Sequence, residues 1–307
     1  MAQGLIHRFP IKSLLEKFAF VAIHYLLICA VSSSYAKWAV NQAQNPPPLW
    51  RAYYIFYGIY AFIVMVVVNA SYTILYIGKF KSIEKYKIQP GPWPWEGKSF
   101  FTPENVSSIK NVLFSILVVI NTLSILFVTT IKPDMRPETA PTLLQHLGCV
   151  VVNLFCEDFF FYFSHLVLHT PWFYRKIHKK HHEPQQITCF TTLDNHWFET
   201  MISGLTTFSG SWILGKRQHF VSMMVFTSVR VWESDDVHSG YRLPFSIFNL
   251  APFMVDPPYH NFHHSHNIGN YSMTLKLWDR FLGTHKPYQE FLNKKKLEEK
   301  EHSDIYE

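Results

Sequence analysis

Apolar residues form several long runs along the chain, separated by short polar segments. Three of these runs, 18–36, 53–78 and 111–131, contain no Asp, Glu, Lys or Arg. A helix of roughly 20 predominantly apolar residues is long enough to cross the hydrocarbon core of a bilayer. The pattern therefore predicts three membrane-spanning helices.

Two further apolar runs carry polar interruptions. The run 142–169 begins apolar and then includes Glu157 and Asp158, and the run 197–232 is broken by Gly-Lys-Arg-Gln at 215–218. We expect the first to be a fourth span, and the second to be a helical hairpin that enters the membrane and returns. Carboxylates are costly inside a membrane, so these two are expected to contact the side chains of metal ligands.

Basic residues predict how the spans are oriented. The loop 79–110 contains six lysines, whereas 37–52 and 132–141 contain two basic residues each. Cytoplasmic loops carry an excess of Lys and Arg. We therefore expect the N-terminus and the loop 79–110 to face the cytosol, and the fourth span to end there. The fold class expected is an all-α, multi-pass membrane helical bundle with a cytosolic His-rich cap for two metal ions.

Composition agrees with a chain that is partly solvated by lipid. Charged residues make up 16% of the sequence, against about 25% in typical soluble domains. The net charge of +6 arises partly from lysines that flank apolar runs, which suits a membrane surface and argues against nucleic acid as a partner.

Histidines are concentrated in the second half of the chain. Twelve of the 17 lie between positions 165 and 266, in motifs that include HLVLH at 165–169, HKKHH at 178–182 and HNFHH at 260–264. Residues spaced i, i+3 and i+4 share one face of a helix, so all three histidines of each HxxHH motif can point the same way. Imidazole nitrogen at such spacings is a ligand for zinc, iron and similar metals.

The number of histidines indicates two metal ions with open positions, because the three motifs alone exceed the four ligands of a structural zinc site. His196 and His238 could complete the two ligand sets. His266 lies two positions beyond its motif and is expected to point away. The predicted metal ligands are His165, His169, His178, His181, His182, His196, His238, His260, His263 and His264. The sequence identifies no catalytic residue beyond this metal centre.

Six segments, in order and spacing, resemble the sterol desaturase/fatty acid hydroxylase superfamily, and within it most of all the methylsterol monooxygenases. They are EDFFFYFSHLVLH, IHKKHHE, DVHSGY, HNFHH, GNY and WDRFLGT. The resemblance covers roughly 140–290 and implies the ligands listed above, with His196 in the place of a further motif histidine.

The resemblance also implies an activity. A centre of two non-haem iron ions would use dioxygen to hydroxylate a lipid. The favoured position is the 4-methyl group of a sterol, and the location is the endoplasmic reticulum membrane. The chain has no nicotinamide-binding glycine motif and no haem domain. Electrons are therefore expected from a partner, and the resemblance implies that this partner is cytochrome b5 with its NAD(P)H-dependent reductase.

Three regions are expected: an N-terminal transmembrane region (1–139), a catalytic fatty acid hydroxylase domain (140–290) and a charged tail (291–307). Alternatives remain for the activity. The lipid could be a fatty acyl or sphingoid lipid that is hydroxylated or desaturated. The chain could also be a non-catalytic membrane metal-binding protein, or a membrane hydrolase that uses zinc. Catalytic zinc sites usually have three protein ligands, far fewer than the chain offers.

Overall fold

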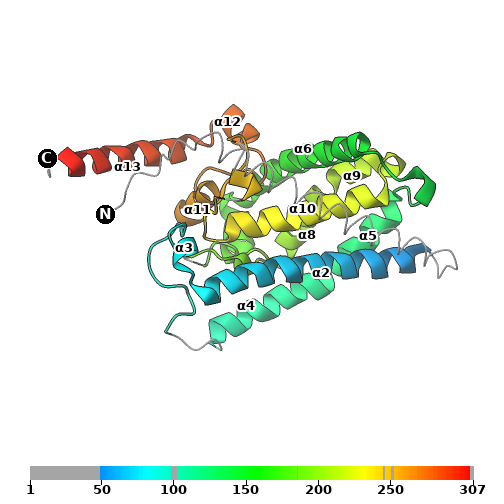
Figure 1. Ribbon diagram of the computed structural model, residues 1–307, viewed down its shortest axis with the longest axis horizontal. Helices are drawn as coiled ribbons and strands as arrows, with labels where there is room; N and C mark the ends of the chain where they lie inside the picture. Colours follow the sequence, from blue (N-terminus) through cyan, green and yellow to red (C-terminus); the bar gives the residue numbers. More distant parts are fainter. Residues whose placement is uncertain (1–48, 98–101, 185, 245, 250–251, 305–307) are drawn as a thin grey trace.

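The described part of the chain is helical. The computed structural model describes residues 49–97, 102–184, 186–244, 246–249 and 252–304 (Figure 1). Within these residues there are helices and three isolated bridges but no strand, which confirms the all-α prediction. The expected span 18–36 lies outside the described residues.

Three described helices are long and apolar enough to cross a membrane. The first lies in α2 (Leu49–Gly78). The second is a continuous rod of α4 (Pro103–Phe114), the π-helical segment η1 (Ser115–Ile120) and α5 (Asn121–Ile131). The third is α6 (Leu143–Leu168), where Thr142 and Gln145 form a capping box at the first turn. These helices correspond to the predicted runs 53–78, 111–131 and 142–169.

The outward faces of these helices are apolar. Large side chains such as Val67, Ile74, Leu117 and Val151 are exposed on them. Apolar residues exposed along whole helices are unusual in a soluble protein and are expected where lipid surrounds the chain. The chain is therefore a multi-pass membrane bundle.

The second half of the bundle contains the predicted hairpin. It consists of α8 (Trp197–Thr207), α9 (Ser209–Leu214), a 3₁₀ turn η5 (Gly215–Arg217) and α10 (Phe220–His238). The reversal begins at Gly215, where φ is +51°, a value that glycine adopts without a steric penalty. Helix α10 packs against α2 and α6 and is buried along almost its whole length, so it forms the centre of the bundle (Figure 1).

Short elements connect and extend these helices. They are α3 (Lys81–Glu84), η2 (Pro137–Thr139), α7 (Pro171–Lys176), η3 (His178–Lys180), η4 (Cys189–Thr191), η6 (Ile247–Asn249), α11 (Pro257–His266), α12 (Leu277–Leu282) and α13 (Lys286–Asp304). Helix α11 begins at a proline pair and ends at Asn267 in the left-handed conformation. Helix α13 projects away from the bundle (Figure 1).

The loop after α2 lies at the same end of the bundle as the histidine motifs. Ile88 donates its backbone N–H to Gly240 O (2.9 Å), two residues beyond His238. At the opposite end of α10, the Asp134 N–H bonds to Gln218 O (2.9 Å). The described residues that follow α2 and the histidines are therefore at one end of the bundle.

Candidate metal centre

Nine of the ten predicted ligands meet at this end of the bundle. Helix α6 supplies His165 and ends at His169, and α10 ends at His238. The 3₁₀ turn η3 and the two residues after it carry the HKKHH motif, and α11 carries HNFHH. The motifs are far apart in the sequence, and the packing of α10 against both α6 and α11 brings them together.

The first group contains His165, His169, His178, His182 and His263, whose ligand nitrogens all lie within 4.8 Å of one another. The Nε2 atom of His178 is 3.1 Å from that of His165, 3.0 Å from that of His169 and 3.0 Å from that of His182. The Nε2 atoms of His169 and His263 are 3.2 Å apart. Five imidazoles thus point their Nε2 atoms at one small space.

The second group contains His181, His238, His260 and His264, again with all ligand nitrogens within 4.8 Å. Successive Nε2 atoms are separated by 3.4 Å for His238 and His181, by 3.0 Å for His260 and His238, and by 3.1 Å for His264 and His260. All four side chains are buried.

Both groups have the dimensions of a metal site. A metal–imidazole bond is about 2.1 Å long, so two ligand nitrogens are about 3.0 Å apart at a right angle and about 3.4 Å apart at a tetrahedral angle. The observed separations cover this range. The described residues therefore fit two metal ions, one held by five imidazoles and one by four.

The HxxHH motifs are divided between the two groups, which differs from the expectation that each motif points one way. Adjacent His181 and His182 belong to different groups, and so do adjacent His263 and His264. The first motif lies in a 3₁₀ segment followed by a turn rather than in an α-helix. In the second, α11 passes between the two groups and presents ligands on both sides.

Hydrogen bonds on the opposite side of the rings orient several ligands. His165 donates its Nδ1–H to Tyr271 O (2.8 Å), His238 to Ser234 O (2.7 Å) and His263 to Gly269 O (2.7 Å). A backbone carbonyl can only accept, so these bonds place the proton on Nδ1 and leave a lone pair on Nε2. This is the tautomer that a metal bound through Nε2 requires.

Burial keeps the clustered histidines neutral. Loss of solvent, together with neighbouring imidazoles, holds the pKa values of His181, His260 and His264 well below the usual range. The same causes lower the pKa of His182 to about 3. Neutral imidazole is the form that binds metal, so the site is ready to bind at neutral pH.

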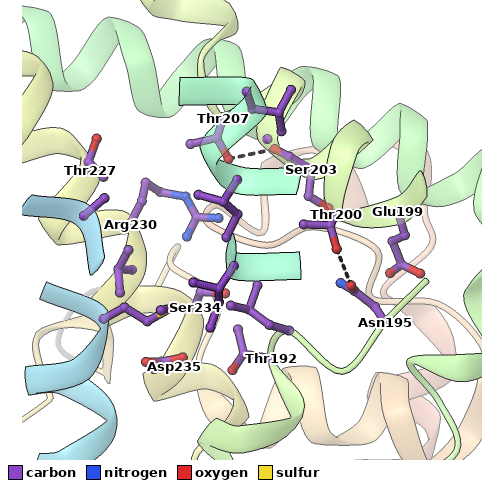
Figure 2. Close-up of a pocket in the computed structure, with 18 of the residues that line it drawn as sticks. Thr192, Asn195, Glu199, Thr200, Ser203, Thr207, Thr227, Arg230, Ser234 and Asp235 are labelled. Carbon is purple, nitrogen blue, oxygen red and sulfur yellow. Dashed lines mark hydrogen bonds between the residues drawn. The ribbon is translucent and has the colours of Figure 1, made fainter. Parts of the chain in front are cut away.

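A cavity of about 460 Å³ leads from both groups into the bundle, and His165, His178, His181, His238 and His260 form its end. Polar side chains line its walls, among them Thr200, Ser203 and Thr207 of α8 and Arg230 and Ser234 of α10 (Figure 2).

Apolar side chains from α2, η1 and α5 line other parts of the same cavity. Phe62 and Leu117 border it and are also exposed on the outer surface. The cavity therefore reaches the lipid-facing surface between α2 and η1. Its shape and lining suit an amphipathic molecule that enters from the bilayer.

Comparisons with known proteins agree with this architecture. The profile described as "Fatty acid hydroxylase" matches residues 150–284. Methylsterol monooxygenase 1 from Gallus gallus is 33% identical over 246 residues, which are 76% of this chain and 79% of that protein. The chain belongs to the fatty acid hydroxylase family.

Two further relatives carry different names. Methylsterol monooxygenase 1 from Rattus norvegicus is 39% identical over 163 residues, 53% of this chain and 54% of that protein, so the match spans about half of the rat enzyme. A very-long-chain aldehyde decarbonylase from Oryza sativa subsp. indica is 34% identical over 226 residues, 71% of this chain and 78% of that protein. No solved structure matches the chain.

Membership of this family makes the chain an oxygen-dependent oxidoreductase. Its relatives and its three apolar helices indicate a membrane lipid oxidase that is similar to the methylsterol monooxygenases. This result favours the catalytic interpretation of the histidines over metal storage and over zinc-dependent hydrolysis.

One predicted ligand, His196, is placed differently. His196 lies outside both groups: its Nδ1 accepts the Phe198 N–H (3.2 Å) and caps the start of α8. His266 lies outside them as expected, with its ring stacked on Phe262 at 4.2 Å between centroids.

Glu199 was not predicted, although it lies in the NHWFE segment that contains His196. Its Oε1 is 2.8 Å from His178 Nδ1, and both side chains are buried. A carboxylate in this position orients the ring and makes it a stronger ligand.

The expectation that Glu157 and Asp158 contact metal ligands is wrong. Arg230 donates to Glu157 and, through Nη1, to Glu233 (2.9 Å). Asp158 accepts the backbone N–H groups of Thr274 (3.2 Å) and Leu275 (2.8 Å). Both carboxylates lie two turns of α6 before His165, where their partners come from α10 and from the segment after α11.

Proposed function

We propose that the chain hydroxylates a membrane lipid with dioxygen and that its two histidine groups hold non-haem iron. The observation that carries this proposal is the pair of all-histidine groups, five of whose histidines line a cavity that reaches the lipid-facing surface. In such a reaction a C–H bond becomes C–O–H, and two electrons and two protons reduce the second oxygen atom to water.

The roles of the chain's residues follow from their positions. The nine Nε2 atoms would hold the metal ions, which supply the dioxygen chemistry when bound. Tyr271 O, Ser234 O, Gly269 O and Glu199 hold four of the rings in place. The cavity walls would exclude bulk water and direct one carbon of the lipid toward the histidines. Residues 140–290 would form the catalytic region.

A sterol is the substrate that we favour, with the 4-methyl group as the carbon attacked. Two of the relatives described above are methylsterol monooxygenases. The cavity also supports a compact amphipathic molecule, because its polar side chains include Thr200 and Asn195 beside Glu199 (Figure 2), the carboxylate that contacts His178. These could bind a hydroxyl group that lies beside the reacting carbon.

A fatty acyl or sphingoid lipid is the second candidate, and the similarity to an aldehyde decarbonylase that acts on very long chains supports it. Lipid profiling of cells that lack the protein separates the two candidates. Accumulation of 4-methylsterols, reversed by the wild-type chain, supports the sterol. Unchanged sterols together with altered hydroxyacyl or sphingoid lipids would contradict the sterol and support the second candidate.

The electron donors proposed are cytochrome b5 and its NAD(P)H-dependent reductase, in the endoplasmic reticulum membrane. The lysines of the loop 79–110 favour a cytosolic location for the metal centre, because this loop lies at the same end of the bundle as the histidines. Soluble donor domains could reach the centre there.

Tags at residue 1 and near Pro90 should be digested by protease added to sealed microsomes, because both positions are expected in the cytosol. A tag in the segment 132–141 serves as the control and should be protected. Protection of the tag near Pro90 would indicate that the metal centre faces the lumen, and it would exclude cytosolic electron donors.

A further inference from the structure

One ligand differs from the other eight in its exposure. His169, at the end of α6, is partly exposed, whereas every other histidine of the two groups is buried. The five-histidine group therefore reaches the outer surface at His169, whereas all four side chains of the other group are buried.

Two tyrosine rings border this outer side of the five-histidine group. Tyr174 of α7 lies 5.6 Å from the ring of His169 and 5.9 Å from that of His182, measured between centroids. Tyr271 lies 4.9 Å from the ring of His169. Both tyrosines are partly exposed, and neither lines the cavity. A single layer of aromatic side chains thus separates the ligands from solvent on this side.

Three exposed cations follow Tyr174 in the segment that carries His178. Arg175, Lys176 and Lys179 form no ion pair with any described residue. Lys180, in the same segment, is paired with Glu183 (3.1 Å), and Lys276 is paired with Asp256 (2.6 Å). The surface beside His169 therefore carries positive charge that the described part of the chain does not neutralise.

We propose that Tyr174, Arg175, Lys176 and Lys179 form a docking face for an acidic one-electron carrier protein, and that electrons enter the centre at His169. The inference rests on the proposed function, because hydroxylation requires two electrons for each dioxygen and the reduced carrier supplies them one at a time. The cavity takes the lipid from the opposite side of the centre. Uncompensated positive charge attracts an acidic partner and orients it during encounter.

The experiment measures carrier binding directly. The full chain is placed in nanodiscs of neutral phospholipid and titrated with the oxidised soluble haem domain of cytochrome b5 at low and high salt. The double variant Arg175→Glu/Lys179→Glu is compared with Lys295→Glu/Lys296→Glu on α13, which changes the net charge equally on a helix that projects away from the bundle. Metal content and thermal unfolding are recorded for both.

The docking-face variant should bind the carrier about tenfold more weakly than wild type at low salt, and the salt dependence of binding should become shallower. The α13 variant should stay within about twofold of wild type. Equal weakening in both variants would show an effect of net charge alone and overturn the proposal. Unchanged binding in the docking-face variant would also overturn the proposal. It would indicate that these cations contact lipid headgroups beside the exposed Trp172 instead of the carrier. Binding of oxidised carrier involves no hydroxylation, so failure of the proposed function would be detected separately, by lipid analysis.

Discussion

Replacing His264 by alanine is expected to abolish oxygen-dependent turnover and to lower the metal content of the purified protein. His264 is one of four histidines in its group, and its Nε2 lies 3.1 Å from that of His260. Without it, three imidazoles remain around that ion, and no other described His, Cys, Asp or Glu belongs to the group. Product formation and metal analysis on the same preparation measure both effects.

His266→Ala is the matched control for that variant. His266 lies on the same helix, but its side chain is exposed and its Nδ1 is 2.8 Å from Ser265 Oγ rather than near either group. This variant should keep both metals and lose activity by at most about tenfold. Equal, complete loss in the two variants would mean that the ligand set is wrong. Retained turnover in His264→Ala would contradict the metal mechanism itself.

Arg230→Leu is expected to destabilise the protein severely. Arg230 is buried and pairs with Glu157 and Glu233, both of which are fully buried. Removal of one partner from a buried ion pair typically costs about 3–5 kcal/mol, because it leaves an uncompensated charge. The loss can be measured as a shift of the unfolding midpoint when SDS is titrated into mixed micelles.

A second substitution tests the cause of that loss. Arg230→Leu combined with Glu157→Gln removes one of the two stranded carboxylates, and it should recover part of the lost stability. A single variant as stable as wild type would show that the ion cluster contributes nothing. If the double variant is no more stable than the single one, the loss of stability comes from altered packing and not from the uncompensated charge.

The sequence predicted the helices well because their determinants are local. Long uncharged runs identified α2, the rod from α4 to α5, and α6. The interruption at Gly-Lys-Arg-Gln located the turn between α9 and α10, where Gly215 has a positive φ. Each of these signals depends on residues that are close together in the chain.

Nine of the ten predicted ligands are brought together for a related reason: two or three histidines in one helical turn are close before any tertiary structure forms. How they are shared between two groups depends on tertiary packing. Adjacent His181 and His182 face different groups: the ring of His181 lies 5.3 Å from that of His238 at the end of α10, and the ring of His182 lies 5.1 Å from that of His169 after α6. Nothing in the spacing of HKKHH specifies this division.

Isolated residues were harder to assign, since their roles depend entirely on distant partners. His196 has no second histidine within a turn, and its ring caps a helix instead of joining a group. Glu199, three residues later, reaches His178. Glu157 was assigned to the histidines because a buried carboxylate needs a partner, and the partner is Arg230 on a different helix.

Metal analysis of an active preparation tests the central claim most directly. The two histidine groups predict close to two metal ions per chain, bound mostly by imidazole nitrogen, with activity that follows the iron content. Zinc can replace iron in overexpressed protein, because affinity alone does not select iron, so turnover must be measured on the same sample. One tightly bound ion per chain in a fully active preparation would contradict the two-metal centre.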